Sequence, residues 1–155
     1  MRRKRNYKRE RKPDLKYGNI IIGRFINYLM SSGKKSVAEG VMYDAMDLVE
    51  KESKQSPVVV LEKALENITP MVEVASKRVG GANYQVPREV RPARKFMLSA
   101  HWLINAARAK KGKPMATKLA EEILLAFKNE GGAIKKKQDM HRMAEANRAF
   151  AHFSW

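Results

Sequence analysis

The sequence predicts a mainly α-helical fold, a six-helix bundle-like domain with one protruding two-stranded β-hairpin between helices three and four. Apolar residues recur at helical spacing along most of the chain, and prolines or glycines separate the periodic segments. One stretch, residues 71–91, departs from that spacing and is rich in β-branched and aromatic residues around two adjacent glycines. At 155 residues the chain has the length of one domain, which we expect to span residues 1–155.

The first two helices are predicted by short apolar stripes and by the residues that flank them. Residues 19–31 place five apolar side chains on one stripe, and Gly33 stands where a left-handed residue commonly ends a helix. Ser36 and Glu39 have the spacing of a capping box, in which the serine hydroxyl and the glutamate carboxylate bond free backbone amides. We therefore expect the second helix to start at Ser36.

Prolines mark the starts of the next three helices. Pro57, Pro92 and Pro114 have the first-turn position that proline favours, and Pro70 prevents the third helix from continuing. The fourth helix carries a wide apolar band, so we expect it to be central, and His101 on that band is interpreted as a core histidine. Two adjacent glycines separate the fifth helix from a sixth that begins near residue 133.

Two runs within residues 71–91 are predicted to pair as an antiparallel hairpin. A turn centred on Gly81 and Ala82 pairs Val79 with Tyr84. Neither face of the ribbon is cleanly apolar, and an isolated two-stranded ribbon is marginally stable in water. We therefore expect its root to be packed and its tip to be held by a partner, which the excess of cations over acids indicates is an anion.

The formal net charge of +16 points to a polyanionic partner, either nucleic acid or an anionic membrane, because like charges at this density repel one another. The chain has no apolar run long enough to span a membrane, and it has no cysteine, which excludes disulfides and thiol catalysis. The charge is uneven: residues 1–12 hold eight bases and one acid, whereas residues 35–66 hold seven acids and four bases. Residues 1–18 are expected to form a basic extended arm that becomes ordered on its partner.

Cations gather in the arm, a Gly-Lys-Lys loop, the hairpin, the start of the fourth helix, the next loop and the first turn of the sixth helix. Three cations in a first turn oppose the helix dipole, which suggests that a bound phosphate offsets the cost. Tyr7, Tyr84 and Trp155 offer rings on which bases could stack. These features predict a helical body with a basic ribbon that binds nucleic acid, without separating RNA from DNA.

Residues suited to catalysis are scarce. His141 and Glu145 lie four residues apart on one helical face with Asp139 nearby, so a metal-dependent nuclease is one alternative, although a helix-surface pair explains them better. Another alternative is a DNA-bending architectural protein that uses the basic ribbon, with Pro87 near its tip as a wedge. We expect no enzyme activity, no cofactor, no metal, no membrane partner and no small-molecule substrate.

Two long motifs carry a resemblance to a known family. Residues 78–94, RVGGANYQVPREVRPAR, resemble the hairpin motif of the bacterial-type small-subunit ribosomal protein seven. Residues 133–153, AIKKKQDMHRMAEANRAFAHF, resemble its last helix, and Gly33-Lys34-Lys35 stands where that family has it. The similarity covers essentially the whole chain, and the N-terminal arm is the least similar part.

The resemblance implies a structural constituent of the small subunit, in a cytoplasmic ribosome of bacterial or organellar type. It implies primary binding to the 3′ major domain of small-subunit ribosomal RNA, nucleation of head assembly, and a place near the exit site, beside transfer RNA, the messenger path and ribosomal proteins nine and eleven. The residues expected to bind ribosomal RNA are Arg2, Arg3, Lys4, Arg5, Lys8, Arg9, Lys34, Lys35, Arg78, Arg91, Arg94, Lys95, Arg108, Lys110, Lys111, Lys113, Lys135, Lys136, Lys137 and Arg142. Those expected to approach exit-site transfer RNA or messenger RNA are Gly80, Gly81, Ala82, Asn83, Tyr84, Arg148 and Trp155.

Overall fold

The computed structural model describes residues 11–153. In chain order its elements are α1 (Ile20–Leu29), α2 (Lys35–Ser53), α3 (Pro57–Ile68), β1 (Val72–Val79), β2 (Ala82–Glu89), α4 (Pro92–Ala109), α5 (Met115–Phe127), α6 (Gly132–Ala146) and the 3-10 helix η1 (Arg148–Phe153). The predicted mainly α fold, with a two-stranded hairpin between the third and fourth helices, is confirmed.

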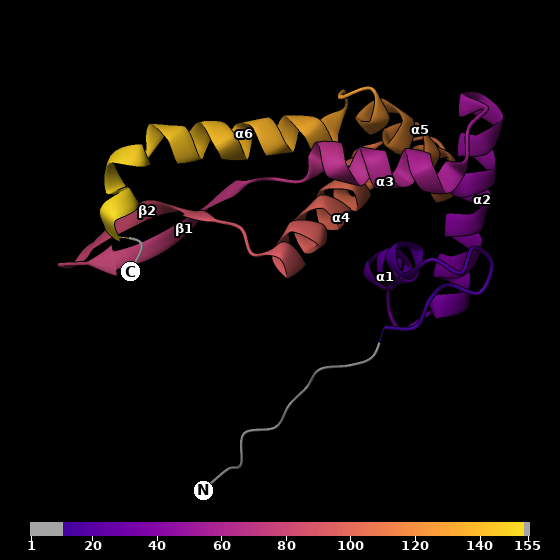
Figure 1. Ribbon diagram of the computed structural model, residues 1–155, viewed down its shortest axis with the longest axis horizontal. Coiled ribbons are helices and arrows are strands. Elements are labelled where there is room, and N and C mark those ends of the chain that lie inside the picture. Colours follow the sequence, from indigo (N-terminus) through magenta and orange to yellow (C-terminus); the bar gives the residue numbers. More distant parts are fainter. Residues whose placement is uncertain (1–10, 154–155) are drawn as a thin grey trace, which may run out of the picture.

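The helices form a body around one buried core, and the hairpin projects from that body (Figure 1). α5 packs against α2, α3, α4 and α6, and α4 packs against α1, α3, α5 and α6. The predicted central helix, α4, therefore shares that place with α5. α6 leaves the body beside α3 and runs to the hairpin, where η1 turns back onto β2 (Figure 1).

The face of α4 that is buried differs from the apolar face that the sequence predicted. His101, expected in the core, is exposed, and its ring lies edge-on to Tyr28 with the centroids 5.1 Å apart. The neighbouring Trp102 is instead buried, with 9% of its surface exposed. Because helices contact α4 on several sides, its apolar band alone does not fix which flanking residues face inward.

α2 begins one residue before the predicted start, and the predicted capping box is wrong. Its N-cap position is Lys34, no side chain caps it, and Ser36 already lies within the helix. Gly33, with φ of 74°, turns the chain so that the Lys35 amide donates to the Gly33 carbonyl at 2.9 Å. The Glu39 carboxylate faces Lys35 Nζ at 3.5 Å rather than returning to the serine amide.

The strands pair in a register two residues away from the predicted one. Val79 pairs with Ala82, so the connecting loop is Gly80 and Gly81. Both glycines have positive φ, 57° and 90°, as a type I′ loop requires at both positions. The predicted turn would have placed Ala82 in the left-handed region, which a Cβ disfavours. A shift of two residues keeps every side chain on its predicted face, because strand side chains alternate with a period of two.

One face of the hairpin is covered by the C-terminal part of the chain. The Tyr84 ring packs against Phe150 and Phe153, with centroids 5.1 and 5.4 Å apart. Lys77 Nζ donates to the Phe153 carbonyl at 2.9 Å, and α6 contacts both strands. The prediction gave the ribbon a packed root and a tip held by a partner; in the structure the same chain also braces the ribbon far beyond its root.

The second half of the predicted arm is folded onto the body. The buried Asp14 carboxylate accepts hydrogen bonds from the amides of Lys16 and Tyr17, both at 3.1 Å. It also accepts from the Tyr43 hydroxyl on α2 at 2.7 Å. Burial, together with this bond to Asp14, raises the pKa of Tyr43 to about 12. Residues 14–17 thus belong to the fold rather than to an extended arm.

Candidate nucleic-acid interface

Glu73 fastens the root of the hairpin to the start of α4. Its residue surface is only 4% exposed, and its carboxylate joins two arginines that come from different elements. Arg88 on β2 donates from Nε and Nη2 to Oε1 at 2.9 and 2.8 Å, and Arg94 on α4 donates from Nε to Oε2 at 2.6 Å. The two guanidinium groups exceed the charge of the single carboxylate, and their side chains remain 52% and 44% exposed.

A hollow at this root is lined by three arginines and two acids, Glu73, Arg88, Glu89, Arg91 and Arg94. Lys95 follows on α4 and is partly buried. The structure therefore brings the predicted RNA-binding residues Arg91, Arg94 and Lys95 together at the start of α4. It adds Arg88, which the sequence reasoning did not select.

A second hollow lies where the chain at residues 11–14 passes α1 and α2. Its lining includes four cations, Arg11, Lys12, Arg24 and Lys35. The Arg24 guanidinium lies 3.8 Å from the centroid of the Phe96 ring on α4, a cation–π contact. Burial, with a smaller contribution from Arg11, lowers the pKa of Arg24. Lys34 of the predicted Gly-Lys-Lys loop is exposed beside Lys35 in sequence.

The end of α4 and the loop that follows it use several of their cations within the protein. Arg108 Nη2 donates to the Leu29 carbonyl at 3.3 Å and so completes the end of α1. The ion pairs with α5 are Lys110–Glu122 at 3.0 Å, Lys110–Glu121 at 3.7 Å and Lys113–Glu121. Lys111 is exposed. Three of the four predicted RNA-binding residues in this region, Arg108, Lys110 and Lys113, thus have structural partners.

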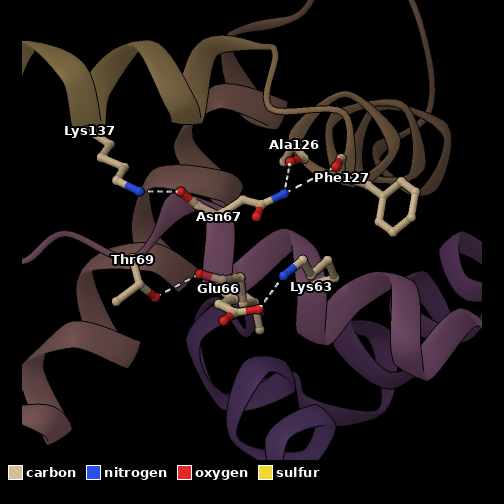
Figure 2. Close-up of polar contacts among 8 residues, drawn as sticks. Lys63, Glu66, Asn67, Thr69, Ala126, Phe127 and Lys137 are labelled. Carbon is tan, nitrogen blue, oxygen red and sulfur yellow. Dashed lines mark hydrogen bonds and ion pairs between the residues drawn. The ribbon is translucent and has the colours of Figure 1, made fainter.

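The three lysines near the start of α6 have different surroundings. Lys135 and Lys136 are exposed. Lys137 Nζ donates to the Asn67 carbonyl at 2.6 Å (Figure 2), and burial lowers the pKa of Lys137. The Asn67 side-chain amide donates to two carbonyls at the end of α5, at 3.0 and 3.1 Å (Figure 2). Lys137 therefore belongs to a junction among α3, α5 and α6.

The start of α6 is capped by a buried acid. Glu122, 1% exposed on α5, accepts the Ala133 amide through Oε1 at 3.0 Å. Gly131 precedes the helix with φ of 96°, and a Cβ there would lie 2.8 Å from that oxygen. The protein's own carboxylate thus offsets the unfavourable placement of the three lysines, which the sequence reasoning had attributed to a bound phosphate.

The hairpin tip presents exposed backbone with few charges. Residues 80–83 are exposed, as is Arg78 on β1, whereas Tyr84 lies partly buried under the C-terminal rings. Arg148 is exposed in η1, and Arg142 pairs with Asp139 at 2.8 Å. The remaining predicted site residues lie outside the described part of the chain: Arg2, Arg3, Lys4, Arg5, Lys8, Arg9 and Trp155.

The residues behind the two alternative functions have ordinary structural surroundings. Within residues 11–153 no group of His, Cys, Asp or Glu could hold a metal ion, and His141 Nε2 accepts the Met71 amide at 3.2 Å. Pro87 pairs with Val74 and is partly buried, so the prediction that it lies near the tip is wrong. In the same part of the chain, no helix is long and apolar enough to cross a membrane.

Sequence reasoning missed the acids that hold the cations in place. Glu122 lies one turn or less from Leu119 and Ile123, so its position on an apolar stripe was an available signal for burial. Glu73 had no such signal, because each face of the strand that carries it mixes polar and apolar residues, so neither face is marked as buried. Its role appears only when β2 and α4 supply their arginines.

A helical body with a braced basic hairpin and cationic hollows is typical of a nucleic-acid-binding protein. The model of the family described as Ribosomal protein S7p/S5e matches residues 1–148, and the chain therefore belongs to this family. Membership makes it a structural, non-enzymatic constituent of the small ribosomal subunit, of bacterial type, located in the ribosome in the cytoplasm.

Curated relatives match along nearly the whole chain. The small ribosomal subunit protein uS7 of Thermosipho melanesiensis is 53% identical over 155 residues, all of both chains. That of Thermotoga maritima is 51% identical over the same span. The uS7 of Bradyrhizobium diazoefficiens is 55% identical over 148 residues, 96% of this chain and 95% of the relative.

Proposed function

We propose that this protein is a primary binding protein of small-subunit ribosomal RNA, that it binds the 3′ major domain and that it nucleates assembly of the subunit head. The observation that carries the proposal is the hollow at the hairpin root, where Arg88 on β2, Arg91 just before α4 and Arg94 on α4 converge. Arginine donors in a planar fork match phosphate oxygens, and contacts of this kind fix a protein on an RNA backbone.

The second cationic hollow supports the same proposal. It is lined by residues of the N-terminal segment, α1 and α2, and Arg24 links it to α4 through the Phe96 ring. Exposed Lys34, Lys111, Lys135 and Lys136 add charge on other parts of the body. Several separate cationic regions suit a folded RNA domain, whose backbone presents phosphates in several directions.

The other end of the hairpin is proposed to face the exit site, where it approaches transfer RNA and the messenger path, with ribosomal proteins nine and eleven as neighbours. Gly80 and Gly81 are exposed, and without side chains their backbone can come close to another nucleic acid. Arg148 in η1 supplies a cation on the segment that packs against β2.

The test is a binding and footprinting experiment on a transcript of the 3′ major domain. We expect protection of a defined region of the transcript at physiological salt, and weaker binding to duplex DNA of equal charge. The DNA serves as the control, because non-specific attraction to phosphates acts on both. Equal affinity for the two nucleic acids would contradict the proposal and favour a general polyanion-binding protein.

A further inference from the structure

The geometry points to a single-phosphate clamp at the hairpin root, formed by Arg88 and Arg94, with Glu73 as the positioning residue. This inference rests on the proposed binding to ribosomal RNA and specifies one of its contact sites. Its starting point is that one carboxylate, almost fully buried, holds two partly exposed guanidinium groups. A carboxylate in that place lowers the local positive charge, so charge alone does not explain its presence on an RNA-binding surface.

The reason lies in which donors the carboxylate occupies. Arg94 uses Nε for Glu73, and Arg88 uses Nε and Nη2. A guanidinium has five N–H donors, and the bonds to Glu73 use only some of them. They do not involve Nη1 of either arginine or Nη2 of Arg94. Both side chains line the same hollow, which Arg91 also borders. The remaining donors are therefore available to one anion in that hollow.

Fixing the arginines in advance also favours binding. A long side chain that is free in solution loses rotamer freedom when it binds, which weakens the complex. Here each arginine is already held by a charge-assisted hydrogen bond at 2.6 to 2.9 Å. Because the bonds come from β2 and from α4, the carboxylate also sets the distance between the two guanidinium groups.

The first test uses a substitution for which two explanations predict opposite results. Glu73→Gln removes a negative charge, so simple charge attraction predicts tighter binding to the 3′ major domain transcript. The clamp predicts several-fold weaker binding, because the arginines lose their common anchor. The matched control is Glu89→Gln, which removes a negative charge at an exposed position in the same hollow. We expect the control to bind as tightly as the wild type or more tightly.

The second test uses the salt dependence of binding and does not depend on how well the Glu73 variant folds. Each neutralised phosphate contributes about 0.9 to the slope of log affinity against log salt. If both arginines hold one phosphate, Arg88→Ala and Arg94→Ala together lower the slope by about 0.9. Two separate phosphates would give a loss of about 1.8, and a pair that does not touch RNA would give none.

The results separate this inference from the proposed function. Selectivity of the wild type for the transcript over duplex DNA tests the function, whereas the difference between wild type and variants tests the clamp. The clamp is overturned if folded Glu73→Gln binds as tightly as Glu89→Gln, or if the double variant loses either nothing or about 1.8 in slope. Circular dichroism and a thermal melt establish that each variant is folded.

Discussion

At the scale of single residues, three buried carboxylates organise the described part, residues 11–153, of a chain of net charge +16. Asp14 accepts two backbone amides and a tyrosine hydroxyl, Glu73 accepts two arginines, and Glu122 accepts one amide in the first turn of α6 and pairs with a lysine. A buried polar group needs hydrogen bonds, which all three acids have, and Glu73 and Glu122 are also paired with cations. The acids thus determine where several of the cations lie.

The glycine beside Glu122 gives the first prediction. Gly131 has φ of 96° and ψ of 177°, a region open essentially to glycine alone, and a new Cβ would meet the Glu122 carboxylate. We expect Gly131→Ala to lower the free energy of unfolding by about 3 kcal/mol. Gly112→Ala is the control, since it has φ of 82° but open space around it, and should cost about 1 kcal/mol. Denaturant unfolding of both variants compares the losses, and equal losses would count against the clash.

The second residue-scale prediction concerns pH. Burial and the nearby Lys137 lower the pKa of His141 below its ordinary 6.5, so the unfolded chain binds a proton more readily than the folded one. The contribution of His141 to stability is therefore complete above that pH and is lost as the pH falls through the range between the two values. Protonation also removes Nε2 as acceptor for the Met71 amide.

We expect the wild type to lose more stability than His141→Gln between about pH 7.5 and about pH 5, the range where histidine titrates. Glutamine stays neutral and can still accept a hydrogen bond, while the carboxylates common to both proteins titrate alike. Urea unfolding at the two pH values measures the difference. A parallel loss in both proteins would remove His141 as the cause.

At the scale of elements, the helices and the hairpin were predictable, but their junctions were not. Pro57 and Pro92 fix helix starts through a rigid φ and a missing N–H, which are local properties of the sequence. The hairpin faces were predictable from the alternation of side chains, whereas the register depended on which two residues form the loop. The bracing by Phe150 and Phe153 depends on residues more than sixty positions from Tyr84, so local patterns carried no sign of it.

The brace leads to a prediction about the hairpin. Phe153→Ala removes one of the two rings that cover Tyr84, so the outer part of the ribbon should open more readily. We expect faster amide exchange for strand residues near Lys77 and Tyr84, with little change at the root, where Glu73 holds Arg88. Hydrogen exchange read residue by residue makes the comparison. Val59→Ala, at a 58% exposed apolar position on α3, is the control, and it should leave hairpin exchange unchanged.

At the scale of the whole molecule, positive charge serves two purposes that the sequence alone could not separate. Arg108, Lys110 and Lys137 support helix junctions, whereas Lys135, Lys136 and Lys111 point to solvent. A charge run looks the same in either case, because its role depends on whether an acid or a carbonyl from another element lies within reach. The candidate site was therefore predictable by region, whereas the role of each cation depends on contacts that only the folded structure shows.

These different contacts predict different effects for substitutions of neighbouring lysines. Lys135→Ala with Lys136→Ala should flatten the salt dependence of ribosomal RNA binding by up to about 1.8 and leave the melting temperature nearly unchanged. Lys137→Ala should instead lower the melting temperature, because the Asn67 carbonyl loses its donor at the junction in Figure 2. Salt titrations and thermal melts of both variants make the test. Matching behaviour of the two variants would mean that the three lysines are equivalent.

The course of α6 has a mechanical consequence. A two-stranded ribbon that is attached only at its root can bend, so the position of its tip varies. In this protein α6 starts at the junction of α3 and α5, reaches the ribbon, and is tied to it again through η1. The hairpin is therefore joined to the body at two places, directly at its root and indirectly through α6 and η1. We therefore expect the hairpin to follow a rotation of the helical body rather than to swing independently of it.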